Sequence, residues 1–411
     1  MTEKTYEITL EKHLYGGETM GRLPEPDNRA VFVPYALPGE RVRIRLFFQK
    51  KGFARAELLE VLEASLERIT PKCKHFGICQ GCAYQHIPYE AQLKAKAEIL
   101  RDQLIRIGKI ENPPVNDTFP SPELWNYRNQ MAFLVTERHI LDNKSPNLLY
   151  LEECHLPTPA INAFWEDLEF GANDIFEQIS LRQDVAENLM FIFYSDNPET
   201  PEMRLLDDLS VVHINNGEAI VMGGDDHLVN LLHGRPFRAS PTSFSHPNLP
   251  VAERIITHLL KTLKLTSKTT LLELYSGIGN FSAFLAEKVD RMVCVESDAT
   301  ACDDFAINLN EFENVELYQA QAMDVLPSLD FTPDILLVDP PVGGLGRQTL
   351  DGILALGSAE LAYVSRDPST LARDAARLLE GGYQLKSVTP FDVAPHTAQI
   401  DSVAIFRLQK S

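Results

Sequence analysis

The segment 271–288, LLELYSGIGNFSAFLAEK, decides the class of fold. Its apolar start is typical of a buried strand, its centre is a turn with Gly277 and Gly279, and its end has the pattern of a helix. Two further strands are indicated by RMVCVESD (291–298) and PDILLVDPP (333–341), with helical stretches between them. Strands that alternate with amphipathic helices predict a doubly wound, Rossmann-like α/β domain.

The glycine turn predicts a ligand site. Two glycines let the backbone turn tightly and approach a ligand at the start of the helix. The third glycine of the dinucleotide fingerprint is absent, which disfavours a dinucleotide. Glu296 ends the next strand, where its carboxylate can accept hydrogen bonds from both ribose hydroxyls, and Glu273 can hold an amino group. This combination favours S-adenosylmethionine, and a turn without a ligand is the alternative.

A second ligand position follows from Asp339, which ends the strand that precedes Pro340 and Pro341. In an open α/β sheet, substrates bind at the carboxyl ends of the strands. Asp339 is therefore a candidate site residue, although two prolines can also serve only to end a strand.

The first 62 residues predict a small all-β module. Strands are expected at 5–9, 30–34, 42–48 and 55–62, separated by turn residues, which fits a closed or nearly closed barrel. The strand RVRIRLF places Arg41, Arg43 and Arg45 on one face. Further candidates for RNA contact follow it: Lys50, Lys51, Phe53 and Arg55. Cations beside aromatic rings are typical of oligonucleotide-binding barrels, while a solvated edge strand is the alternative.

The composition bounds the classes of function. The chain has 411 residues with 38 basic and 58 acidic side chains, a net charge of −20, and 44% hydrophobic residues, which excludes a disordered chain and a small disulfide scaffold. Residues 1–70 hold 11 basic and 11 acidic side chains, so the acidic excess lies in residues 71–411. No apolar run reaches the roughly 18–20 residues of a membrane span. The charged start resembles no signal or transit peptide, and we expect a cytoplasmic protein.

Six cysteines raise the question of a metal. Cys73, Cys79 and Cys82 form a C-x5-C-x2-C cluster, and Cys154 returns later in the chain. Disulfides are not expected in a reducing compartment, so structural zinc, a 4Fe–4S cluster, or no metal are the alternatives. Cys294 and Cys302 belong to strand and helix patterns and read as core residues. A helix is expected at 89–108, and an α+β region follows with strands at 130–135, 190–194 and 210–214.

Several segments together resemble the RNA uracil-C5 methyltransferase family, class I enzymes with a TRAM domain and a 4Fe–4S cluster. They are ALPGERVRIRLFFQKKGFARAEL (36–58), CKHFGICQGCAYQHIPYEAQLKAK (73–96), WNYRNQMAF (125–133), SPTSFSHPN (240–248), ELYSGIGNFSAFLA (273–286), DPPVGGLG (339–346), YVSRDPSTLARD (363–374) and PHTAQIDSV (395–403). The resemblance implies three parts: a TRAM barrel that binds RNA (1–62), a central α+β domain with the cysteines (63–248), and a methyltransferase domain (249–411).

The resemblance also implies ligands. Cys73, Cys79, Cys82 and Cys154 would hold the cluster. The methyltransferase motifs of the family imply an S-adenosylmethionine site formed by His246, Glu273, Tyr275, Gly277, Gly279, Glu296 and Asp339. The substrate would be rRNA or tRNA, and the pattern implies no membrane and no obligate protein partner.

The site departs from the family pattern at four positions. Family enzymes add a cysteine thiolate to C6 of uracil, and a carboxylate later removes the C5 proton. The cysteine of the YVSC(N/D)P segment is Arg366 here, and a guanidinium stays protonated and cannot add to C6. In the PHTxHxE segment the histidine is Gln399 and the glutamate is Asp401. His246 replaces a glutamine and Val342 replaces an arginine.

We therefore predict that cysteine-dependent C5 methylation is absent or extremely slow. One hypothesis is a methyltransferase that acts on a nitrogen or oxygen of RNA, with Asp339 or Asp401 as proton acceptor and Arg366 in contact with phosphate or a base edge. A second is a catalytically degenerate protein that still binds RNA, cofactor and cluster. A third is a methyltransferase redirected to another substrate.

Overall fold

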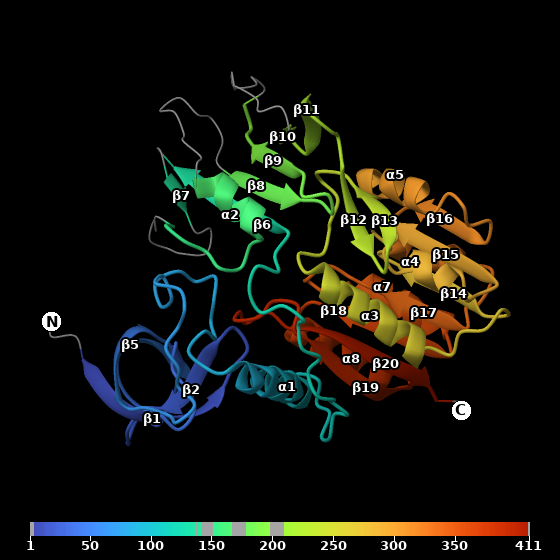
Figure 1. Cartoon of the computed structure of the whole chain (residues 1–411). Helices are drawn as coiled ribbons and strands as arrows, with labels where there is room; N and C mark the ends of the chain where they lie inside the picture. The colour runs from blue at the N-terminus through green and yellow to red at the C-terminus, as the bar shows by residue number, and fades with distance from the viewer. Residues whose placement is uncertain (1–3, 137–138, 142–150, 167–177, 198–208, 410–411) are drawn as a thin grey trace.

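The computed structural model describes residues 4–136, 139–141, 151–166, 178–197 and 209–409. Figure 1 shows a small barrel at the N-terminus, a sheet in the middle of the chain, and a larger layered unit that ends at the C-terminus. The predicted fold class, a small β-barrel followed by α+β and doubly wound α/β regions, is confirmed in these elements.

The N-terminal barrel is closed. Its strands run in the order β1 (Thr5–His13), β2 (Glu18–Arg22), β3 (Ala30–Pro34), β5 (Phe53–Glu63) and β4 (Arg41–Gln49). Val42 and Ile44 point into the barrel and are fully buried, so the arginines between them face outward. Because β4 pairs with both β1 and β5, the alternative that it is an edge strand is wrong. The sequence prediction also missed β2.

The central sheet has the order β11 (Glu218–Gly223), β10 (Leu209–Asn215), β9 (Leu189–Tyr194), β8 (Gln178–Gln183), β6 (Gln130–Thr136) and β7 (His139–Leu141). β6, β9 and β10 are the strands that the sequence predicted. Helix α2 (Pro159–Glu166) contacts β8, and β12 (Leu228–Leu232) and β13 (Arg235–Ala239) form a separate hairpin.

The C-terminal unit contains a seven-stranded sheet. Its order is β16 (Val315–Gln319), β15 (Arg291–Glu296), β14 (Thr270–Leu274), β17 (Ile335–Val338), β18 (Glu360–Ser365), β20 (Asp401–Leu408) and β19 (Tyr383–Phe391). The strands are parallel except β20, which runs antiparallel to both of its neighbours. The chain leaves β14 for β15 on one side and later reaches β17 on the other, so the order reverses there, which is where ligands bind in such sheets.

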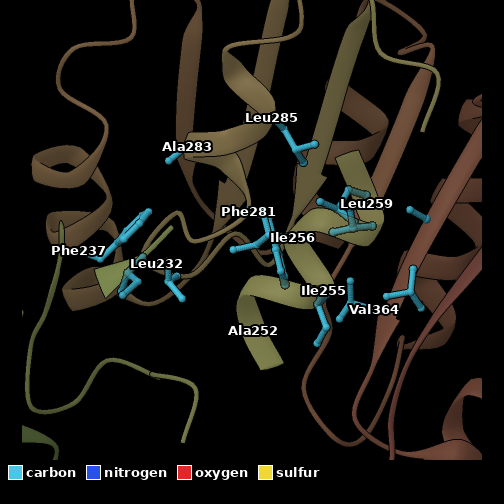
Figure 2. Packing of buried hydrophobic residues seen from close by; sticks show 14 of the residues in the cluster. Leu232, Phe237, Ala252, Ile255, Ile256, Leu259, Phe281, Ala283, Leu285 and Val364 are labelled. Carbon is cyan, nitrogen blue, oxygen red and sulfur yellow. The ribbon is translucent and has the colours of Figure 1, made fainter. Parts of the chain in front are cut away.

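Helices cover both faces of this sheet. They are α3 (Leu249–Thr262), α4 (Ser282–Ala286), α5 (Ala299–Asn308), α6 (Ala322–Val325), the short 3-10 turn η1 (Leu326–Ser328), α7 (Arg347–Leu356) and α8 (Pro368–Glu380). Within β14, Leu271 joins one buried cluster and Leu272 joins the other, which is the alternation of a strand buried on both faces. Figure 2 shows the first cluster, where Ile256 of α3 lies near Phe281.

Helix α1 (Tyr89–Arg106) comes early in the chain but packs on the C-terminal unit. It contacts α8, and Leu100 and Leu104 belong to the same buried cluster as the sheet. Asn248 caps α3 by accepting a hydrogen bond from the Val251 amide. The domain limits 1–62, 63–248 and 249–411 stay a prediction. Across the described ranges, no helix has the length and apolar character to cross a membrane.

Candidate functional site

A cavity of about 310 Å³ opens at the carboxyl ends of β14, β15, β17 and β18. Its walls include the predicted residues His246, Tyr275, Gly277, Glu296, Asp339 and Arg366. These residues come from separate segments, and the structure brings them together because parallel strands end at one edge of the sheet.

The glycine turn after β14 has the conformation that its sequence requires. Gly277 (φ 55°) and Gly279 (φ 88°) are both left-handed. A Cβ at Gly279 would lie 2.2 Å from Leu309 Cδ1, so this glycine packs against α5 behind the cavity wall. The Gly277 amide donates a hydrogen bond to Glu296 Oε2 at 2.9 Å, which fixes the turn to the end of β15.

Glu296, at the end of β15, lines the cavity. Its Oε1 accepts hydrogen bonds from the amides of Ser297 at 2.6 Å and Asp298 at 2.8 Å. A carboxylate has about four acceptor positions, so acceptor capacity is left toward the cavity. On the same wall, Ser276 Oγ and Asp339 Oδ1 are buried with no hydrogen-bond partner among the described residues. Orphaned polar atoms of this kind fit a polar cofactor such as S-adenosylmethionine.

Glu273 lies at the end of β14, beneath the glycine turn. The side chain is fully buried, and its Oε2 accepts a hydrogen bond from Ser282 Oγ at 2.6 Å beneath the turn. Burial raises the pKa of Glu273 to about 8, so the carboxyl is largely protonated at neutral pH. Glu273 is not among the residues that line the cavity, and its Oε1 is buried without a hydrogen-bond partner in the described ranges. Its contact with an amino group of the cofactor stays a prediction.

The cavity at the carboxyl ends of the strands, which we call the cofactor cavity, meets a second cavity at Arg366. Arg366 Nη2 donates a hydrogen bond to Asp339 Oδ2 at 2.9 Å, and its guanidinium carbon lies 3.8 Å from the centroid of the Phe244 ring. Both partners of the ion pair are largely buried, with side chains 17% and 9% exposed. Burial raises the pKa of Asp339, and the guanidinium opposes that rise.

The second cavity, of about 540 Å³, holds the predicted base. It shares Phe244, His246 and Arg366 with the cofactor cavity, and Gln399 and Asp401 line it as well. Asp401 is 3% exposed and accepts a hydrogen bond from Gln399 Nε2 at 3.3 Å. Burial raises the pKa of Asp401 to about 7, although Arg366 opposes this. Burial, and then Arg366, lower the pKa of His246 to about 3, so its ring is neutral.

The sequence analysis missed several lining residues. Tyr15 and Gly16 come from the turn between β1 and β2, Gln130 from β6, and Phe244 from the segment before α3. A turn was expected at Gly16, but no local pattern says that it reaches an active site. Phe244 lies inside the quoted SPTSFSHPN segment, and its position two residues before His246 was the available signal.

All four predicted cysteine ligands line one further cavity of about 310 Å³. None of these four cysteines forms a disulfide within the described ranges, and burial raises the pKa of Cys82 to about 11. In the described ranges, no group of three or more His, Cys, Asp or Glu side chains is arranged to hold a metal ion.

Two arginines lie on the wall of the same cavity. Within the part of the chain that the structure describes, Arg128 and Arg182 have no carboxylate partner, and the Nε of each is buried without a hydrogen bond. Burial lowers the pKa of Arg128, but the Tyr127 phenol and then the thiols of Cys154 and Cys82 outweigh burial, so the pKa is raised. The cavity wall therefore holds positive charge, which fits an anionic group bound by thiolates.

The arginine face of the barrel is neutralised by glutamates. Arg41 pairs with Glu7 at 2.7 Å and with Glu63 at 2.9 Å, and Arg45 pairs with Glu57 at 2.5 Å. Arg43 contacts Glu7 at 3.1 Å and also pairs with Glu60. These carboxylates come from β1 and β5, the two neighbours of β4, so the face carries little net positive charge.

The other predicted RNA-contact residues lie around the β4–β5 turn. The Lys50 ammonium lies 5.5 Å from the centroid of the Phe48 ring, and Lys51 follows it. Phe53 stacks on Phe32 with ring centroids 5.4 Å apart, and Arg55 lies 3.5 Å from Glu18. Beside them Phe47 is 68% exposed. Among the described residues, neither lysine has a carboxylate partner, so this end of the barrel combines accessible rings with ammonium groups that are not in ion pairs.

The sheet, the glycine turn and the cavity at the carboxyl ends of the strands define the chain as a class I S-adenosylmethionine-dependent methyltransferase with an N-terminal barrel. The sequence profile of the tRNA (uracil-5-)-methyltransferase family matches residues 208–409, and the TRAM domain profile matches residues 1–59. Full-length relatives agree with these matches. The chain therefore belongs to the tRNA (uracil-5-)-methyltransferase family, and its TRAM barrel is confirmed.

Two relatives and one solved structure illustrate the similarity. An RNA methyltransferase of Halalkalibacterium halodurans is 30% identical and covers 98% of this chain and 97% of its own length. One of Listeria innocua is 30% identical and covers 99% and 98%. The crystal structure of Pyrococcus abyssi tRNA (uracil-54, C5)-methyltransferase with S-adenosyl-L-homocysteine has a TM-score of 0.73 at 21% identity, covering 97% of this chain and 99% of that one.

Proposed function

We propose that this protein transfers a methyl group from S-adenosylmethionine to a nitrogen or oxygen atom of RNA without a covalent bond between enzyme and base. The observation that carries the proposal is the buried Asp401 carboxyl, with its pKa raised to about 7, in a cavity that shares three wall residues with the cofactor cavity. Arg366 occupies the position where the covalent route needs a thiolate, and a guanidinium cannot supply one.

The proposed chemistry needs only a proton acceptor. When bound, S-adenosylmethionine supplies an electrophilic methyl group. An exocyclic amine, a ring N–H group or a hydroxyl of RNA that attacks it must lose a proton, and a carboxyl whose pKa lies near the working pH is well suited to accept that proton. Asp401 is the residue in this position, and Gln399 Nε2 orients its Oδ1. His246 stays neutral beside it and adds no charge.

A second candidate function is binding of RNA and cofactor without turnover. The ion pair between Arg366 and Asp339 favours it, because the guanidinium lies on the wall that both cavities share. A cation at this point opposes the positive sulfonium group that must approach the acceptor.

Labelled methyl transfer distinguishes the two functions. Purified protein is incubated with methyl-labelled S-adenosylmethionine and with rRNA and tRNA from cells that lack the gene, and modified nucleosides are identified by mass spectrometry. We expect an N- or O-methylated nucleoside, lost in Asp401→Asn and kept in Asp117→Asn, an exposed control. No transfer, with binding of S-adenosylhomocysteine and RNA intact, would establish the second candidate. Formation of 5-methyluridine by the unaltered protein contradicts both.

We propose that Cys73, Cys79, Cys82 and Cys154 hold a 4Fe–4S cluster. Their thiols line one cavity, and the guanidinium groups of Arg128 and Arg182 on its wall, which have no carboxylate partner in the described ranges, suit the negative charge of a thiolate-ligated cluster. Anaerobically purified protein should contain about four irons per chain. Cys82→Ser should lose them, whereas a colourless, zinc-containing protein contradicts the cluster.

We propose that the barrel contacts rRNA or tRNA through the β4–β5 turn. Unpaired ammonium groups and exposed rings support this, since single-stranded RNA binds by stacking and by phosphate contacts. Replacing Lys50 and Lys51 by Ala should reduce affinity for total tRNA and its salt dependence. Arg43→Ala, which removes an ion-paired cation from the same barrel, is the control. We further propose a cytoplasmic location, where RNA and reduced cysteines occur together.

A further inference from the structure

The turn between β1 and β2 reaches from the barrel into the methyltransferase unit. Gly16 (φ 97°) and Gly17 (φ 88°) are both left-handed, which allows the tight turn. A Cβ at Gly17 would lie 2.5 Å from Ala83 Cβ and 3.5 Å from Ala398 Cβ. The turn is thus packed between the segment after the cysteine cluster and the segment that leads to Asp401.

Tyr15, at the tip of this turn, makes a specific bond to the methyltransferase unit. Its hydroxyl donates a hydrogen bond to Asp367 Oδ2 at 2.7 Å. Burial raises the pKa of Tyr15, and Asp367 adds to the rise, so the phenol keeps its proton and acts as a donor. The ring packs against a buried cluster that includes Ile400, the residue that precedes Asp401.

Asp367 connects the Tyr15 hydroxyl to the backbone next to Arg366. Its Oδ1 caps helix α8 by accepting hydrogen bonds from the Ser369 and Thr370 amides, each at 2.8 Å. Oδ2 is thereby turned toward Tyr15, and the preceding residue, Arg366, is held between the end of β18 and the cap of α8. The phenol therefore fixes the backbone that presents the guanidinium to both cavities.

We propose that Tyr15 is a positioning residue of the second cavity, which contains Asp401 and is called the acceptor cavity from here on. The barrel then completes the active site in addition to binding RNA. Tyr15 and Gly16 line the cavity together with Arg366, Gln399 and Asp401. The hydroxyl sets Arg366 through Asp367, and the ring closes the side of the cavity that faces the barrel. This inference rests on the proposed function, since it assigns a role within the same acceptor cavity.

The test is a double-mutant cycle of Tyr15→Phe and Asp367→Asn. Each variant removes the hydrogen bond between phenol and carboxylate, and Asn at 367 keeps an oxygen that can cap α8. A hydrogen bond to a charged group predicts a fall of about tenfold in kcat for methyl transfer to RNA, with the KM for S-adenosylmethionine unchanged. The double variant should fall no further than either single variant, because both lose the same interaction. Tyr6→Phe, the same change on β1 of the barrel, is the control and should leave kcat unchanged.

A second readout needs no turnover. Affinity for total tRNA in the presence of S-adenosylhomocysteine should fall by about threefold in each single variant and no further in the double variant. Unaltered protein that transfers no methyl group to any RNA pool overturns the proposed function, and this affinity cycle still decides the inference. Additive losses, or a Tyr15→Phe variant that equals Tyr6→Phe in both readouts, overturn the role of Tyr15.

Discussion

Asp401→Asn should make the protein more stable at alkaline pH while it abolishes methyl transfer. The folded protein holds this carboxyl 3% exposed, and burial raises its pKa from 3.8 to about 7. Asparagine has the same shape and never ionises, and its Oδ1 can still accept the hydrogen bond from Gln399. The variant therefore removes only the cost of a buried negative charge.

The sign and size follow from proton binding. Between pH 4 and pH 7 the folded state keeps a proton on Asp401 that the unfolded state has lost, so stability falls as the pH rises through this range. The gap between 3.8 and about 7 corresponds to about 4 kcal/mol once both states are ionised. The variant should exceed the unaltered protein by about 2 kcal/mol at pH 5.5 and by about 4 kcal/mol at pH 8.

The assay is urea denaturation followed by circular dichroism at pH 5.5 and pH 8. Asp117→Asn makes the same change at an exposed position and should show no pH-dependent difference. Methyl transfer is measured on the same preparations. An equal stability difference at both pH values would falsify the reasoning, because it would show that Asp401 ionises in the folded protein as it does in the unfolded chain.

Three further predictions concern packing and charge. Gly279→Ala should lose affinity for S-adenosylhomocysteine by more than tenfold in calorimetry, because its Cβ would lie 2.2 Å from a leucine methyl. The matched variant Gly277→Ala places its Cβ in open space, so it carries only the backbone strain of about 1–2 kcal/mol. Gly17→Ala should be less stable than Gly16→Ala by about 1–3 kcal/mol of overpacking, measured by urea denaturation, and equal values contradict the packed turn. Arg128→Met should lose visible cluster absorbance to a chelator faster than the unaltered protein, whereas an unchanged rate argues against charge balance at the cysteines.

Local patterns carried much of the fold. The apolar strands and their glycine turns predicted the doubly wound sheet, because strand and helix periodicity and left-handed glycines are properties of short segments. Strand β2 was missed because its sequence, ETMGR, is not enriched in β-branched residues and does not alternate clearly between apolar and polar residues. It becomes a strand because β1 and β3 leave backbone hydrogen-bonding groups on both sides that only a strand can satisfy.

The sequence by itself determined the class of protein, the four cysteines that gather at one cavity, and the replacement of the nucleophile by Arg366. Tertiary structure alone decided what the charged groups do. Arg43 is neutralised by Glu7 and Glu60 because barrel closure sets these strands beside β4, and Glu273 is buried where its Oε2 accepts a hydrogen bond from Ser282 Oγ. Tyr15 reaches Asp367 across 352 residues of sequence. Such pairings depend on strand register and on how units pack, and no local pattern encodes either of these.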